Sequence, residues 1–293
     1  DSEGRIYNGN PGGDNVRSGS TRLFAADDIG APDNPLKTSV GKLEGTSIGG
    51  GVWIVNTGHL TVGGVTDTTD GVTAAGSVVI TATSPVTVTE TIQASDIFVT
   101  AGDDTMDGTP DTDDDLIVKS GVRLWSTAGG VILRAGDDLI IEEGATVRAA
   151  TSIMLFGDYD NADDGVGAAI TVSGMVAAPR VEIYGGPDND TMLIDWQAGD
   201  SSDVKVDGGL GFNTLLLLAS EGADAVAIAR QGQGLKVTMN PTAIVGENIQ
   251  VLGIWTGGGN DSVNVGDLSG IMTEPVAIDL GAGDDVLDGT RAT

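Results

Sequence analysis

The stretch VILRAGDDLIIEEGATVRAA, residues 131–150, consists of three short apolar segments separated by two polar corners. Strand-forming residues fill 131–134, 139–141 and 145–149, and the turn-forming sequences AGDD and EEG lie between them. Similar strand-and-corner segments recur along the chain, with starts that are 34, 22, 28 and 23 residues apart, at Ile97, Val131, Ile153, Val181 and Val204. Because the longer intervals contain insertions, the repeating unit is about 22 residues.

Three strands per repeat, with corners that accept insertions, indicate a chain in which each strand pairs with its counterpart one turn later. We therefore predict an all-β fold, a right-handed parallel β-helix of about 22 residues per turn with loop insertions. Signals for antiparallel hairpins are scarce, and the best helical pattern, residues 224–234, is cut short by Gly232. Near residue 180 the corners become richer in glycine. We place a soft boundary there, between coils of residues 1–180 and acidic, glycine-rich coils of residues 181–293 that continue them.

The charge of the chain restricts its partners. The 293 residues carry a formal net charge of −29, and 34 of the 43 acidic residues are Asp, the turn-forming carboxylate. This charge disfavours nucleic acid and anionic membranes and leaves cations as the natural ligands. No apolar run approaches the ~20 residues that span a bilayer, so we expect no membrane insertion. The absence of cysteine excludes disulfides and is compatible with an exported protein.

Two parts of the chain resemble known families. The segments LFAADDIGAPDNPLKTSVGKLEGT (residues 23–46) and GGGVWIVNTGHLTVGGV (residues 49–65) resemble coils of large bacterial surface proteins of the filamentous-haemagglutinin-like, β-helical type, and the likeness covers roughly residues 15–180. The C-terminal corners resemble the RTX-type calcium repeat, G-G-x-G-x-D-x-U-x, in which U is a large apolar residue. GGLGFNTLL (208–216) fits with Asn213 in the Asp place, and TGGGNDSVN (256–264) and LGAGDDVLD (280–288) fit with the first Gly replaced.

The RTX resemblance implies calcium, although here the repeats are not in tandem. The key position recurs at Asp190, Asn213, Asp261 and Asp285, with about one turn between the first two and between the last two, and this spacing predicts a single ladder of stacked sites. Calcium takes six to eight oxygen ligands, and a glycine-rich corner offers both carboxylates and carbonyls. The candidate calcium ligands are Asp104, Asp138, Asp188, Asp190, Asn213, Asp261, Asp284 and Asp285, together with Gly257 and Gly281. The alternative is that these residues only form turns and cap neighbouring amides.

Catalytic chemistry is poorly represented, and we assign no catalytic residue. A β-helical polysaccharide lyase, epimerase or glycosidase is the alternative function, but such enzymes need a positioned acid or base, and His59 is the one histidine. Four arginines either line one face or act as solubilising charges: Arg123, Arg134, Arg148 and Arg180. The four tryptophans either stack on sugars or pack at turns: Trp53, Trp125, Trp196 and Trp255.

Our interpretation is a structural segment of a secreted or cell-surface bacterial adhesin or extracellular filament, stiffened by calcium. We expect an extracellular or cell-surface location. The last turn, which ends at DGTRAT without an amphipathic cap, predicts self-association or stacking on neighbouring repeats of a larger chain. Cell-surface or matrix glycans are further candidate partners, and nucleic acid is not.

Overall fold

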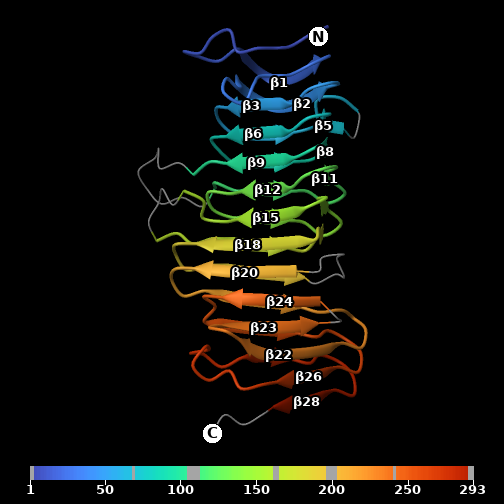
Figure 1. The fold of residues 1–293 in the computed structure, drawn as a ribbon, viewed down its shortest axis with the longest axis vertical. Coiled ribbons are helices and arrows are strands. Elements are labelled where there is room, and N and C mark those ends of the chain that lie inside the picture. Colours follow the sequence, from blue (N-terminus) through green and yellow to red (C-terminus); the bar gives the residue numbers. More distant parts are fainter. Residues whose placement is uncertain are drawn as a thin grey trace.

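The computed structural model describes residues 3–67, 70–103, 113–160, 165–195, 203–239 and 242–289. Within these ranges all regular secondary structure is β, and 28 strands form one hydrogen-bonded sheet in which most neighbours are parallel. Figure 1 shows the strands stacked in layers along the long axis, from the N-terminal to the C-terminal end. The predicted all-β, predominantly parallel architecture is therefore confirmed.

Most strands fall into three columns, within which each strand pairs in parallel with the next. The first column contains β3 (Val52–Asn56), β6 (Val78–Ala82), β9 (Ile97–Ala101), β12 (Val131–Arg134), β15 (Ser152–Phe156), β18 (Arg180–Gly186), β20 (Asp203–Gly209) and β24 (Thr242–Glu247). The second contains β4 (Leu60–Val62), β7 (Val86–Val88), β10 (Leu116–Val118), β13 (Leu139–Ile141), β16 (Ala169–Val172), β19 (Thr191–Asp195), β21 (Thr214–Leu218), β25 (Val251–Trp255) and β27 (Ala277–Asp279). The third contains β5 (Asp70–Ala74), β8 (Thr91–Ala94), β11 (Arg123–Ser126), β14 (Thr146–Arg148) and β17 (Met175–Ala177).

The register of the first column follows the predicted repeat. The five predicted strand starts pair with one another in sequence order, from Ile97 to Val204. In the same strands Leu133, Leu155 and Ile183 are aligned in parallel register and are at most 2% exposed. Alternate residues of each strand point into the core, as the buried and half-buried alternation of β6 and β9 shows. A continuous apolar core thus runs through the layers.

Two long strands begin the described stack. β1 (Val16–Ala25) pairs with β2 (Leu36–Ser47) over most of its length. Different parts of β2 then pair with β3, β4 and β5, so that one strand covers all three columns. The transition from one long strand to three short ones sets the corners for the layers that follow.

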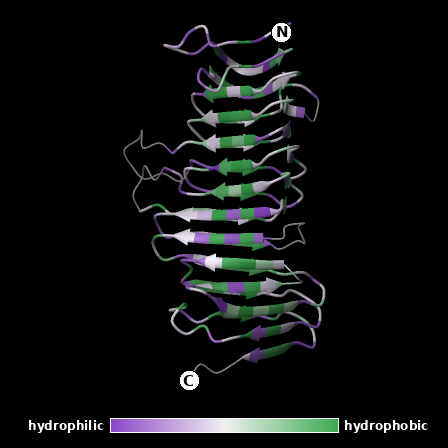
Figure 2. Cartoon of the chain, viewed as in Figure 1, coloured by the Kyte–Doolittle hydropathy of each residue, from purple (hydrophilic) through white to green (hydrophobic). Residues whose placement is uncertain are grey.

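The third column ends at β17, whereas the first column continues to β24 and the second to β27. Hydrogen bonds between β15, β18 and β20 cross residue 180, and the predicted domain boundary there stays a prediction. Figure 2 shows mostly hydrophobic colour on the first-column strands down to β15 and a mixture of hydrophobic and hydrophilic residues on β18 and β20.

One antiparallel insertion departs from the expected pattern. Strand β23 (Gly234–Met239) pairs antiparallel with both β22 (Ala225–Gln231) and β24. Strand β22 also pairs in parallel with β26 (Ser262–Val265), which pairs in parallel with β28 (Val286–Gly289). The segment with the best helical pattern is therefore a strand followed by a tight hairpin, and Gly232 supplies its left-handed turn conformation at φ 64°. No helix suited to crossing a membrane occurs in the described ranges.

Candidate corner site

A ladder of polar side chains lies at the corner that leads from the first column into the second. In each case a side-chain oxygen accepts a hydrogen bond from a backbone N–H one layer earlier. The bonds run from Asp114 N to Asp137 Oδ2 (2.9 Å), Ala168 N to Asp190 Oδ1 (2.8 Å), Asp190 N to Asn213 Oδ1 (2.9 Å) and Asn213 N to Gln250 Oε1 (2.6 Å). These side chains satisfy main-chain donors where the chain leaves one column for the next.

Asn213 shows what a fully paired member of this ladder requires. Its side chain is buried, its Oδ1 accepts the Asp190 N–H, and its Nδ2 donates to the carbonyls of Leu210 (2.8 Å) and Asn248 (3.1 Å). An amide suits the position because one atom accepts and the other donates toward carbonyl oxygens.

Asp190 occupies the same place one layer earlier but lacks the donor. It is 1% exposed, and its Oδ2 has no hydrogen-bond partner among the described residues. A methyl group on Gly185 would collide with this Oδ2 and would lie 2.7 Å from the carbonyl oxygen of Gly208, so both oxygens approach one small space. Burial raises the pKa of Asp190 to about 6, and the nearby Asp188 adds to the effect, whereas the bond from Ala168 opposes it.

Asp158 extends this acidic corner by one layer. Its Oδ2 accepts the Asp188 N–H at 3.3 Å, and its buried Oδ1 has no partner among the described residues. Burial raises the pKa of Asp158 to about 7, and the charges of Asp190, Asp188 and Asp103 contribute in the same direction. Asp188 itself accepts a bond from the Gly165 N–H at 3.0 Å. The sequence-predicted ligands Asp188 and Asp190 are therefore close to a third acid that the prediction missed.

Asp138 belongs to a neighbouring pair of bonds at the same corner. Its Oδ1 accepts the Ala169 N–H at 2.7 Å, and its own N–H donates to Asp115 Oδ1 at 3.3 Å. Burial raises the pKa of Asp138. Burial also raises the pKa of Asp115 to about 6, with Asp138, Asp113 and Asp114 adding repulsion. Asp104, the other candidate from this part of the chain, lies outside the described residues.

Asp261 and Asp285 form a second ladder at a different corner, where the chain enters β22, β26 and β28. Asp261 Oδ1 accepts the Asp224 N–H and Asp285 Oδ1 accepts the Asp261 N–H, both at 2.9 Å. Asp261 is 1% exposed, and its Oδ2 has no partner among the described residues. The expected single ladder is therefore wrong. Asp190 precedes a second-column strand, whereas Asp261 precedes a strand that continues the first column through β22.

The glycines of this second corner allow close backbone approach. Gly257 and Gly281 have φ values of 80° and 70°, and a methyl group on Gly281 would collide with the Gly257 carbonyl. That carbonyl oxygen accepts the Ala282 N–H at 3.0 Å, so it already has one partner. Asp284 is exposed, and its N–H donates to Asn260 Oδ1 at 3.0 Å.

Several ladder residues were absent from the prediction, although the sequence contains a signal for them. Each ladder acid or amide of these corners lies two residues before an apolar residue of the following strand, as Asp137 lies before Leu139 and Asp224 before Val226. Alignment on that apolar residue identifies Asp137 and Asp224, whereas alignment on the preceding glycines selects Asp138. Asp158 follows a different spacing, and its role depends on the layer that covers it.

The donor set bears on metal binding in two ways. Buried carboxylate oxygens without a hydrogen-bond partner in the described part of the chain include Asp158 Oδ1, Asp190 Oδ2 and Asp261 Oδ2 at these corners, and Glu90 Oε2 between β7 and β8. Across the described part of the chain, no group of three Asp, Glu or His side chains is arranged to hold a metal ion. A cation at these corners would therefore rest on one or two carboxylates together with backbone carbonyls, a donor set that calcium accepts.

In comparisons with known proteins, no family model, curated protein or solved structure matches the chain.

Proposed function

We propose that the chain is a structural segment of a secreted or cell-surface bacterial adhesin or extracellular filament, wound as a right-handed parallel β-helix. The residue-by-residue parallel register from β3 to β24 supports this proposal because each layer templates the next. The observation that carries it is the corner ladder, in which buried polar side chains bond to the backbone of the preceding layer. These side chains connect the layers, which is a structural use of acids.

We further propose that calcium stiffens the corners. Asp190 Oδ2 and the Gly208 carbonyl are two oxygens that approach the same space, and Asp158 Oδ1 is a further buried oxygen with no hydrogen-bond partner among the residues that the structure describes. A buried carboxylate oxygen without a donor is unfavourable, and a divalent cation compensates its charge. At an extracellular-type affinity, with free calcium about tenfold above the dissociation constant, each site contributes about 1.4 kcal/mol.

Thermal unfolding with excess calcium and with chelator tests the calcium proposal. We expect the melting temperature to be several degrees higher in calcium, and magnesium to substitute poorly because it requires regular octahedral geometry. Asp190→Ala and Asp285→Ala should each reduce the calcium response. Asp67→Ala is the control, because Asp67 is exposed in a Thr-rich loop. Coincident melting curves in calcium and chelator would show that the acids only form hydrogen bonds.

The structural proposal has its own test, independent of calcium. Small-angle scattering should give an elongated particle, and interruption of the corner ladder by Asn213→Ala should lower the unfolding free energy by about 1–3 kcal/mol, since it leaves the buried Asp190 N–H unpaired. A compact particle, or an unchanged stability of Asn213→Ala, would contradict the proposal.

A further inference from the structure

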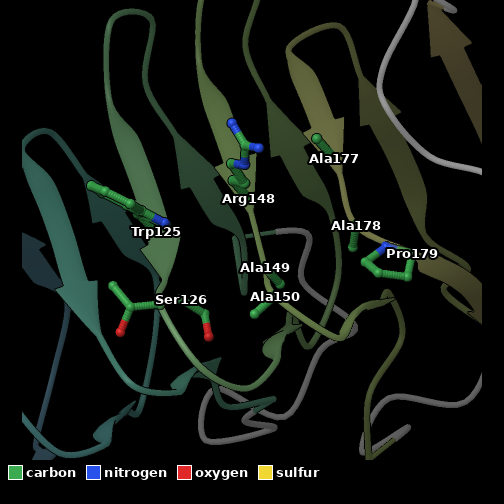
Figure 3. Close-up of a pocket in the computed structure, with 9 residues that line it drawn as sticks. Trp125, Ser126, Arg148, Ala149, Ala150, Ala177, Ala178 and Pro179 are labelled. Carbon is green, nitrogen blue, oxygen red and sulfur yellow. The ribbon is translucent and has the colours of Figure 1, made fainter.

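The outer side of the third column has a groove whose lining residues differ chemically from the acidic corners. It has a volume of about 670 Å³ and is bounded by the ends of β11 and β14 and the segment after β17. Figure 3 shows Trp125 and Arg148 on neighbouring strands, with the small side chains of Ala149, Ala150 and Ala178 between Trp125 and Pro179 in this view. Its volume is in the range of sites that bind small ligands.

The strand register places the tryptophan and the arginine side by side. Trp125 and Arg148 are direct partners in the parallel pairing of β11 with β14, so their backbones are about 4.8 Å apart. Leu124 and Val147, their neighbours in sequence, are buried in the core, which directs Trp125 and Arg148 outward. Trp125 is 37% exposed, and the Arg123 guanidinium lies 5.2 Å from its ring centroid.

Two arginines lie at this surface: Arg148 lines the groove, and Arg123 contacts the Trp125 ring. Neither Arg123 nor Arg148 forms an ion pair among the described residues, although the chain has 43 acidic residues. The described ion pairs use other cations, namely Arg5, Arg17, Arg22, Lys119, Arg180 and Lys205. A guanidinium without an internal carboxylate, next to an exposed aromatic ring, is suited to an external carboxylate.

The rest of the groove is small and uncharged. Ala149, Ala177 and Ala178 are buried, and their small side chains leave open space beside the large Trp125 side chain. The hydroxyls of Ser126 and Thr127 donate to the carbonyls of Ser95 (2.6 Å) and Ala94 (3.0 Å), which holds these side chains in place. No carboxylate is among the residues that line this groove in the described structure.

We propose that this groove binds an oligosaccharide that carries carboxylates, with a sugar ring against the exposed indole of Trp125, on the face opposite Arg123, and a uronate carboxylate on the guanidinium of Arg148. The aromatic face matches the apolar face of a pyranose ring, and the guanidinium matches a carboxylate in geometry and charge. The overall charge of −29 does not prevent this, because exposed charges are screened beyond about 8 Å at physiological ionic strength. Two arginines suit one carboxylate per sugar better than the dense phosphates of nucleic acid.

The inference goes beyond the structural role, and its test is run in chelator so that bridging by calcium does not contribute. Calorimetric titration with an oligogalacturonate at about 0.15 M salt should show binding that weakens as salt is added. Trp125→Ala and Arg148→Gln should each weaken binding at least tenfold. Trp255→Ala is the matched aromatic control, since Trp255 is 38% exposed. Arg17→Gln is the matched cationic control, since Arg17 is exposed and pairs with Asp14. Both controls should bind as the parent chain does.

Each contrary result identifies an error in the inference. Absence of heat at millimolar oligogalacturonate, or full binding by Trp125→Ala or Arg148→Gln, would overturn it. Equal affinity for a neutral oligosaccharide of the same length would overturn the role of Arg148, and equal affinity for polyglutamate would assign the groove to an acidic peptide instead. Melting curves of all four variants in chelator report whether they fold, and the calcium response of the parent chain is measured separately.

Discussion

Substitution of Asp190 separates its hydrogen-bonding role from its charge. Asp190→Asn keeps an oxygen to accept the Ala168 N–H and replaces the unpaired oxygen by an amide donor. Asn213 shows the expected geometry one layer later, where Nδ2 donates to the carbonyls of Leu210 and Asn248. The first-column register aligns Asp207 with Glu247, so Gly208 corresponds to Asn248, and we expect its carbonyl to accept from the new amide as the Asn248 carbonyl accepts from Asn213.

The structure gives the size and sign of the effect. In chelator, Asp190→Asn should stabilise the chain by about 0.5–1.5 kcal/mol, the net contribution of one hydrogen bond. The reason is that an amide NH2, which can donate to a carbonyl, replaces a buried carboxylate oxygen. Asp190→Ala should destabilise the chain by about 1–3 kcal/mol, because the buried Ala168 N–H loses its acceptor. The two variants at one position should therefore shift stability in opposite directions.

Urea unfolding followed by circular dichroism measures both effects, in chelator and in excess calcium. If calcium binds at Asp190, the advantage of Asp190→Asn should shrink or reverse in calcium, because the amide is a weaker ligand than the carboxylate. Asp67→Asn is the control, since Asp67 is exposed and should respond to neither condition. A loss of stability for Asp190→Asn in chelator would refute the argument that Oδ2 lacks a partner, and an equal calcium response of variant and parent would exclude a calcium site at Asp190.

Three further predictions concern pH, backbone conformation and association. Because the pKa of Asp158 is raised to about 7, the folded chain binds a proton that the unfolded chain has released, so the unfolding free energy in chelator should fall as pH rises from about 4 to about 7. Asp158→Asn should make the urea midpoint depend less on pH over that range. A midpoint of the parent chain that rises with pH would contradict this. Gly209→Ala should lower the unfolding free energy more than Gly121→Ala, because a methyl group at Gly209 would collide with the Gly186 carbonyl. Gly121 is the matched control, since its φ of 79° nearly equals the 80° of Gly209 but its surroundings are open. Equal losses of stability, near the roughly 1–2 kcal/mol of left-handed strain, would disprove the collision. Leu287 is 55% exposed on β28, and Leu287→Lys should reduce self-association in light scattering; an unchanged molecular mass at every concentration would contradict this.

Local sequence was sufficient to predict the layers of this protein. The apolar segments that begin at Ile97, Val131 and Ile153 pair in the predicted register because inward-facing side chains must alternate along each strand and stack on their counterparts. The same rule identifies the strand alignment of Leu133 with Leu155. It also explains why insertions at the corners leave the register unchanged, since they lie outside the paired segments.

The identity of the corners could not be predicted in this way. Asp190 and Asp261 have similar sequence surroundings, yet one precedes a second-column strand and the other follows the antiparallel insertion of β22 and β23. Which column a strand joins depends on the partner that it finds in the previous layer, and that partner is distant in sequence. Spacing along the chain therefore predicted one ladder where the structure has two.

The chemistry of the corner acids also depends on tertiary contacts. The motif around Asp190 specifies a carboxylate in a tight turn, and this much follows from Asp and Gly preferences. Its Oδ2 is buried because Gly185 and Gly208 bring neighbouring layers against it, and among the described residues the layer before supplies the Ala168 N–H, which bonds to the other oxygen. Local conformational preference and alternation act within one layer and are legible in the sequence. Burial, pKa and the pairing of polar atoms are properties of the contact between layers, so only the folded stack decides them.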